Sequence, residues 1–151
     1  MAENQFVIFR LGNEMYAVDI LNVGGISEYR DITNVPNAPY FIEGIINLRG
    51  DIIPIINLKK RFEIPEKEVD PDTRIIINNI GGKDMGFIVD EASQVVKIDD
   101  ENIEVAPEII KGNERAYIHG VGKMGEDIVI LLDLEKVLSD EEKQEVMGMD
   151  S

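Results

Sequence analysis

The stretch that most constrains the fold runs from Gly44 to Leu58 and reads GIINLRGDIIPIINL. Two isoleucine-rich runs, Ile45–Leu48 and Ile52–Ile56, flank a tight Arg49-Gly50-Asp51 corner. Isoleucine is β-branched and suits a strand, and glycine supplies the positive φ that a hairpin turn needs. The stretch therefore predicts a β-hairpin with Arg49 at its tip.

Neither run of this hairpin alternates between polar and apolar residues, so each predicted strand must be covered on both faces. One face can fill a core, and the other must meet another layer of the protein or a partner. Pro54 has no amide N–H, which places its side of the strand at an edge, a bulge or a strand start.

The rest of the chain predicts short strands separated by Gly, Pro and Asn turns. The expected strands are Phe6–Phe9, Met15–Val18, Val23–Ile26, Arg74–Asn78, Met85–Val89, Ser93–Ile98, Tyr117–Val121 and Ile128–Leu132. Short helical turns are expected at Ile20–Asn22, Leu58–Phe62 and Leu134–Leu138, capped by Asp19, Asn57 and Asp133. A capping box that begins at Ser139 predicts a C-terminal helix to about Val146. Glu63–Thr73 is expected to be a linker, and Asp99–Gly112 to be irregular.

The pattern of the first half recurs in the second half. Phe6-Val7-Ile8 matches Ile75-Ile76-Ile77 after a shift of 69 residues, and Asp19 matches Asp90 after a shift of 71. A shift of 76 matches Gly44, Asp51, Ile52 and Leu58 with Gly120, Asp127, Ile128 and Leu134. Two similar β-rich halves explain this, although chance similarity in an isoleucine-rich chain is the alternative. Because small barrels remove exposed strand edges, we expect residues 5–62 and 74–138 to form one barrel each, followed by a helix and tail over 139–151.

Charge and composition exclude several classes of function. The chain has 151 residues and a net charge of −15, which argues against nucleic-acid and anionic-membrane binding. The one basic cluster, Lys59-Lys60-Arg61, is interpreted as a solvated helix end. There is no cysteine, so disulfides and Cys-ligated zinc are excluded. No apolar run approaches the roughly 20 residues of a membrane span and no secretory signal is visible, which favours a cytoplasmic protein.

No set of residues assembles an obvious active site. Gly120–Gly125 fits a dinucleotide-binding glycine pattern, but a strand and two acids follow it instead of a helix. His119, the single histidine, is expected to be structural or exposed. Asp19, Asp90 and the acids at 99–101 leave open a small carboxylate- or metal-dependent hydrolase. Arg49 is either a recognition residue or a solvated turn residue.

Several of these segments together resemble a known family. They are Phe6–Phe9, Tyr16–Ile20, Val35-Pro36, Gly44–Gly50, Ile53–Leu58, Gly86–Asp90 and Leu131–Asp133, in order and at matching spacing. On these segments the chain, as a single domain over residues 1–151, is similar to CheW, the chemotaxis coupling protein family. The resemblance implies a mainly β fold of two five-stranded SH3-like barrels around a common core, with short helices and a C-terminal helix.

The resemblance also implies an adaptor without catalytic activity or cofactor. Its partners would be the regulatory domain of the histidine kinase CheA and the signalling tip of methyl-accepting chemoreceptors, with no nucleic acid and no direct membrane insertion. A CheW-like regulatory piece of a larger kinase is a further possibility.

The receptor-binding residues expected in a groove between the barrels are Val23, Ile26, Gly44, Ile45, Asn47, Arg49 and Gly50. The kinase contact is expected at an apolar barrel end, without named residues. Many family members carry an acidic residue in the segment that matches Gly24-Gly25, which this chain lacks.

Overall fold

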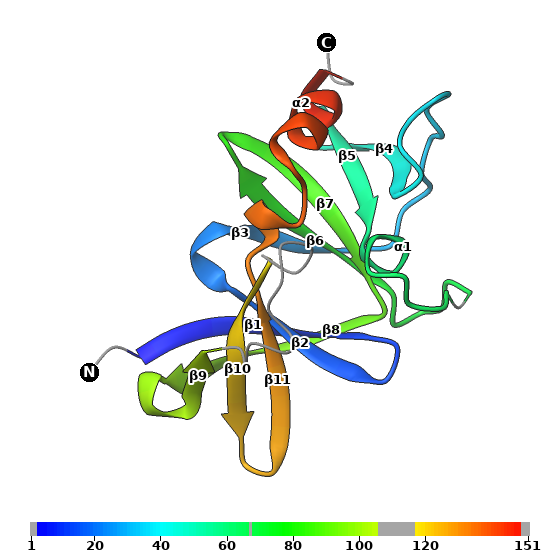
Figure 1. The fold of residues 1–151 in the computed structure, drawn as a ribbon. Coiled ribbons are helices and arrows are strands. Elements are labelled where there is room, and N and C mark those ends of the chain that lie inside the picture. Colours follow the sequence, from blue (N-terminus) through cyan, green and yellow to red (C-terminus); the bar gives the residue numbers. More distant parts are fainter. Residues whose placement is uncertain (1–2, 67, 106–116, 149–151) are drawn as a thin grey trace.

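The computed structural model describes residues 3–66, 68–105 and 117–148 of the chain, and its described strands form two sheets (Figure 1). The six-stranded sheet has the order β8-β1-β2-β11-β10-β9, and the five-stranded sheet has the order β3-β6-β7-β5-β4. The strands of the first half are β1 (Glu3–Leu11), β2 (Glu14–Asp19), β3 (Val23–Glu28), β4 (Ile42–Leu48) and β5 (Asp51–Asn57). Those of the second half are β6 (Arg74–Ile80), β7 (Lys83–Val89), β8 (Glu91–Asp99), β9 (Ile103–Val105), β10 (Ile118–Met124) and β11 (Asp127–Leu132).

Short helices follow several strands. They are η1 (Ile20–Asn22), α1 (Leu58–Arg61), η2 (Asp100–Asn102), η5 (Leu134–Lys136) and α2 (Asp140–Gly148). The predicted caps are confirmed, because the side chains of Asp19, Asn57 and Asp133 each accept a backbone N–H of the helix that follows. The capping box is also confirmed: Glu142 N donates to Ser139 Oγ, and Ser139 N donates to Glu142 Oε1. The predicted mainly β fold, with short helices and a C-terminal helix, is therefore confirmed.

One local prediction was wrong. The segment Asp99–Gly112 was expected to be irregular, but it contains η2 and the strand β9. β9 pairs with β10, and only three residues separate it from β8. The chain itself therefore joins the two outer strands of the six-stranded sheet. The rest of the expected irregular segment, from residue 106 to 112, lies outside the described residues.

The expected division into barrels at 5–62 and 74–138 was also wrong, because the two halves exchange strands. The six-stranded sheet takes the hairpin β1–β2 from the first half and its other strands from the second. The five-stranded sheet takes the hairpin β6–β7 from the second half and its other strands from the first. Two parallel pairs, β2 with β11 and β5 with β7, make the exchange. Each sheet is therefore assembled from strands of both halves.

A single bridge brings together the outer strands of the five-stranded sheet. After β3 the chain reaches Thr33, whose N–H donates to the carbonyl of Ile45 on β4 at 2.9 Å, while Ile45 N donates back at 2.9 Å. Gly44 lies beneath this crossing. A Cβ there would lie 2.1 Å from the Thr33 carbonyl oxygen, so only glycine fits.

The core explains why the central strands are apolar on both faces. Ile55, Ile75 and Ile77 belong to a cluster inside the five-stranded sheet, whereas the alternate residues Ile56 and Ile76 face a larger cluster. That larger cluster also contains residues of the six-stranded sheet, so it is a core shared by both sheets. A third cluster fills the inside of the six-stranded sheet. The common core implied by the family resemblance is therefore present.

The prediction that Lys59–Arg61 is a solvated helix end was wrong. Lys59 is buried, and its Nζ lies 2.8 Å from Oδ1 of the buried Asp90. Arg61 pairs with Glu142 at 3.0 Å, donates to the carbonyl of Val137 at 2.9 Å and lies over the ring of Phe41. The cluster therefore joins α1 to the end of β7 and to the C-terminal helix.

Candidate functional site: the hairpin-tip groove

The tip of the β4–β5 hairpin is a two-residue turn. Leu48 pairs with Asp51, which leaves Arg49 and Gly50 as the turn residues, with φ values of 56° and 91°. Positive φ at both positions is typical of a type I′ turn, whose twist matches that of the flanking strands. The side chain of Asn47 accepts the N–H of Gly50 at 2.9 Å and holds the turn closed.

Arg49 is an unusual residue for its place in this turn. The other two-residue hairpin turns of the described chain have Gly12, Gly81 or Gly125 at the first position, with φ of 61° to 63°. A side chain in this region costs about 1–2 kcal/mol relative to glycine. Arg49 is exposed, and within the described residues no hydrogen bond or ion pair holds its guanidinium. An exposed, conformationally costly side chain without a structural partner favours a role in recognition.

A groove of about 360 Å³ separates the hairpin tip from β3. The residues that line it are Gly24, Gly25, Ile26, Ser27, Glu28, Arg30, Leu48, Arg49, Asp51, Ile53, Ile77 and Asp84. Four of these are large apolar residues, and the charged ones carry both signs. Such a surface suits the docking of a peptide or helix with an apolar face and polar edges.

The polar groups of the groove form contacts within the rim. Ser27 donates from Oγ to the carbonyl of Glu28 at 2.9 Å and accepts from Arg30 Nε at 3.2 Å. No histidine, cysteine or other nucleophile with an adjacent base lies among the described residues of the groove.

The structure brings together two of the seven expected receptor-binding residues, Ile26 and Arg49, which line the groove from opposite sides. Asn47 and Gly50 instead hold the turn, as described above. The remaining three support the sheet: Val23 packs against the shared core, Gly44 lies under the Thr33 crossing, and Ile45 forms the bridge to Thr33.

Sequence reasoning missed the groove residues contributed by β3 beyond Ile26 and by the β6–β7 hairpin. Ile77 and Asp84 lie far from Arg49 in the sequence, and they reach the groove because β6 pairs with β3 and β7 pairs with β5. The exchange of strands was the missing information. The one available signal was Gly24-Gly25, the segment in which many family members carry an acidic residue. A Cβ at Gly25 would meet nothing within 4 Å, so the groove has room for a side chain there.

The residues considered for a hydrolase do not come together. Asp90 contacts the N–H of Gly12 at 2.7 Å, at the turn that begins β2, whereas Asp19 lies at the other end of β2. Asp100 accepts a hydrogen bond from Asn4 at 2.7 Å. In the part of the chain that the structure describes, no group of three or more His, Cys, Asp or Glu residues is placed to hold a metal ion.

Comparison with known proteins gives a consistent result. The CheW-like domain model matches residues 5–142. A chemotaxis protein CheW of Klebsiella aerogenes is 43% identical over 138 residues, which are 91% of this chain and 83% of that protein. The CheW protein of Treponema pallidum is 37% identical over 149 residues, covering 96% and 88% of the two chains.

A solved structure agrees with the same family. The crystal structure of the scaffolding protein TtCheW from Thermoanaerobacter tengcongensis superposes with a TM-score of 0.83 and 40% sequence identity, over 90% of this chain and 92% of that chain. Among the described residues, no helix has the length and apolar character needed to cross a membrane.

Proposed function

Because the chain belongs to the CheW family of chemotaxis scaffold proteins, we propose that it couples methyl-accepting chemoreceptors to the histidine kinase CheA in the cytoplasm. The CheW relatives form a non-catalytic adaptor family, and the chain is such an adaptor. The proposed partners are the receptor signalling tip and the regulatory domain of CheA.

The observation that carries the receptor assignment is Arg49. It lies at the groove rim on the β4–β5 hairpin, in a backbone conformation that the other two-residue hairpin turns of the described chain fill with glycine. Its aliphatic stem can lie on apolar surface while its guanidinium meets a carboxylate or a carbonyl of the partner. Ile26, Leu48 and Ile53 offer the apolar floor that a helix of the receptor tip would contact.

The kinase contact is proposed to lie outside this groove, because a coupling protein must hold both partners at once. Binding of the receptor tip and of the CheA regulatory domain to one molecule of this protein tests that requirement. A ternary complex is expected in size-exclusion chromatography. Full competition between the two partners would contradict the adaptor function.

Replacement of Arg49 by alanine tests the receptor site. Arg49→Ala should weaken binding of the receptor tip by about 2 kcal/mol or more, as for a hot-spot residue, and leave CheA affinity and the thermal midpoint unchanged. Arg10→Ala is the matched control, since Arg10 is an exposed arginine on β1 outside the groove. If Arg49→Ala binds the receptor tip as well as Arg10→Ala does, Arg49 is only a solvated turn residue.

A further inference from the structure

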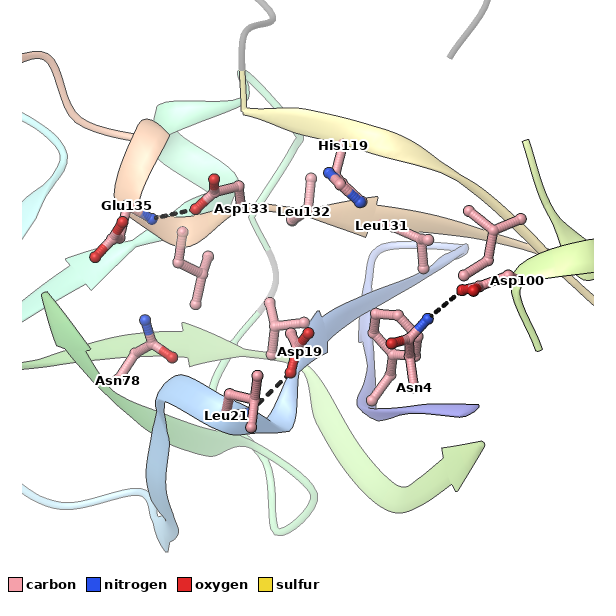
Figure 2. Close-up of a pocket in the computed structure, with 14 residues that line it drawn as sticks. Asn4, Asp19, Leu21, Asn78, Asp100, His119, Leu131, Leu132, Asp133 and Glu135 are labelled. Atoms are coloured by element: carbon pink, nitrogen blue, oxygen red, sulfur yellow. Dashed lines mark hydrogen bonds between the residues drawn. The ribbon is translucent and has the colours of Figure 1, made fainter. Parts of the chain in front are cut away.

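A second cavity, of about 410 Å³, lies where the parallel strands β2 and β11 end at the same edge of the six-stranded sheet (Figure 2). The turns η1 and η5 begin at this edge, and β6 of the other sheet closes the cavity from the side. Its apolar walls are Phe6, Val18, Leu21, Ile103, Leu131, Leu132 and Leu134. The volume falls in the range of about 300–1,000 Å³ that is usual for ligand sites.

Asn78 is the polar residue buried in the wall of this cavity. Its exposed fraction is 3%, and it occupies the face of β6 on which its neighbours Ile76 and Ile80 enter the shared core. Among the described residues, no hydrogen bond reaches its side-chain amide. Because a buried amide without a partner is costly, Asn78 needs a group that the cavity itself must supply.

The charge around the cavity is one-sided. Its lining includes the carboxylates of Asp19, Asp100, Asp133 and Glu135, and no lysine or arginine among the described residues. Asp19 accepts the N–H of Leu21 at 2.9 Å, and Asp133 accepts the N–H of Glu135 at 3.1 Å. Figure 2 shows these turns and Asn78 arranged around one hollow.

The internal repeat relates this junction of β2 and β11 to the junction of β5 and β7, where the equivalent positions hold different side chains. The shifts of 69, 71 and 76 residues relate Phe9 to Asn78, Asp19 to Asp90, and Lys59 to Glu135. At the junction of β5 and β7, Phe9 is fully buried, and Lys59 forms the buried ion pair with Asp90 at 2.8 Å. At the junction of β2 and β11, the lysine is replaced by glutamate and the aromatic ring by an amide. The junction of β2 and β11 therefore lacks the internal cation that the junction of β5 and β7 contains.

We propose that an arginine side chain of a partner protein occupies this cavity, at a site separate from the hairpin-tip groove. A guanidinium offers five N–H donors, enough for the Asn78 carbonyl and the surrounding carboxylates. It is more weakly hydrated than an ammonium group and packs flat against apolar walls. Leu21, which is 85% exposed at the rim, extends the contact to the backbone and neighbours that carry the arginine.

A nuclear magnetic resonance titration of the intact chain tests the chemistry of the cavity. The probe is Nα-acetyl-arginine N-methylamide, and its matched control is the citrulline analogue, which has nearly the same shape without the charge. The arginine probe should shift the side-chain amide signals of Asn78 and the backbone signals of His119 and Glu135. The citrulline probe should not. Equal shifts with both probes would overturn the proposal, and so would tighter binding of the free polyamine spermidine.

A charge replacement provides the second test. Glu135→Lys recreates the cation that Lys59 supplies at the other junction, and it should weaken binding of the arginine probe by about tenfold or more. Glu126→Lys makes the same change in charge at the exposed β10–β11 turn and should bind the probe like the wild type. Wild-type affinity in Glu135→Lys would overturn the assignment. If Glu135→Lys does not fold, the comparison of arginine with citrulline still decides.

Discussion

The two halves of the chain build equivalent elements that serve different purposes. At the hairpin tips, the first half has Arg49-Gly50 where the second has Gly125-Glu126, and the first positions have φ of 56° and 63°. The backbone is alike at that position, but one half places there a costly, unpartnered arginine. This difference is consistent with the proposed recognition role of Arg49 at the first tip.

The two junctions where parallel strands end also differ, because one is closed by an ion pair and the other is an open cavity. At the junction of β5 and β7, Lys59 of the first half forms a buried ion pair with Asp90 of the second. At the junction of β2 and β11, Glu135 of the second half and Asp19 of the first leave an open, acidic cavity. Both halves contribute to both junctions, but only the junction of β2 and β11 is open. The two junctions therefore have similar backbones and differ in a few side chains.

The largest effect is expected from breaking the closed junction. Lys59→Met leaves the Asp90 carboxylate buried without a cation, which should lower the free energy of unfolding by about 3–5 kcal/mol. Urea unfolding measures this loss. The double variant Lys59→Met/Asp90→Asn should recover much of it, because no charge is then left buried.

The open junction provides the control for that experiment. Glu135→Met removes the repeat-related residue, which is exposed, and it should change stability by only a few tenths of a kcal/mol. If Lys59→Met were as mild as Glu135→Met, the ion pair would not stabilise the junction of β5 and β7, and the contrast between the junctions would fail.

The second effect concerns Gly50. Gly50→Val forces a β-branched residue to φ of 91°, so it should destabilise the hairpin by about 1–3 kcal/mol although a Cβ meets nothing within 4 Å. The repeat-related Glu126 has no positive φ, and Glu126→Val should leave the thermal midpoint nearly unchanged. Equal midpoints for the two variants would show that backbone strain at Gly50 is absorbed by the turn.

Local features of the fold could be predicted from the sequence. The hairpin, its turn, the three side-chain caps and the capping box depend on residues within a few positions of one another, and short-range chemistry determines them. The doubly apolar strands correctly indicated cover on both faces. The shared core provides that cover for Ile56 and Ile76.

Features that depend on distant pairing could not be predicted. Nothing local to β2 or β7 indicates that each pairs with a strand from the other half, so the division at 62 and 74 was wrong. For the same reason Lys59 was taken for a surface residue, and Ile77 and Asp84 were not expected near Arg49. Gly44 was assigned to the receptor site from the family resemblance, and its place under the Thr33 crossing could not be predicted from the sequence.

A smaller change in the free energy of unfolding, of opposite sign, is expected when Arg49 is replaced by glycine, the residue found at the equivalent position 125. Arg49→Gly relieves the positive φ at the turn and should raise the free energy of unfolding by about 1 kcal/mol. Gly125→Arg should lower it by a similar amount. If Arg49→Gly is more stable and also binds the receptor tip more weakly, then Arg49 lowers the stability of the turn but strengthens receptor binding. A loss of stability in Arg49→Gly would mean that the guanidinium holds the hairpin.

The smallest effect comes from an ion pair that only one half possesses. Glu43 Oε1 lies 2.8 Å from Lys60 Nζ and accepts the side-chain N–H of Asn57 at 2.9 Å. The residues related to Glu43 and Lys60 by the shift of 76 are His119 and Lys136, which cannot form such a pair. Burial alone would raise the pKa of Glu43, but the hydrogen bonds from Lys60 and Asn57 and the charge of Lys60 lower it below its ordinary value.

This ion pair makes a prediction about pH. A lowered pKa in the folded state means that Glu43 stabilises the fold above the ordinary glutamate pKa, and that this contribution is lost as the pH falls through the lowered value. Glu43→Gln should therefore cost about 0.5 kcal/mol or less near neutral pH, because the pair is partly exposed and screened, and nothing in acid. Thermal midpoints measured against pH test this, with Lys136→Met as the control. A Glu43→Gln deficit that persists unchanged in acid would assign the effect to packing and remove this difference between the halves.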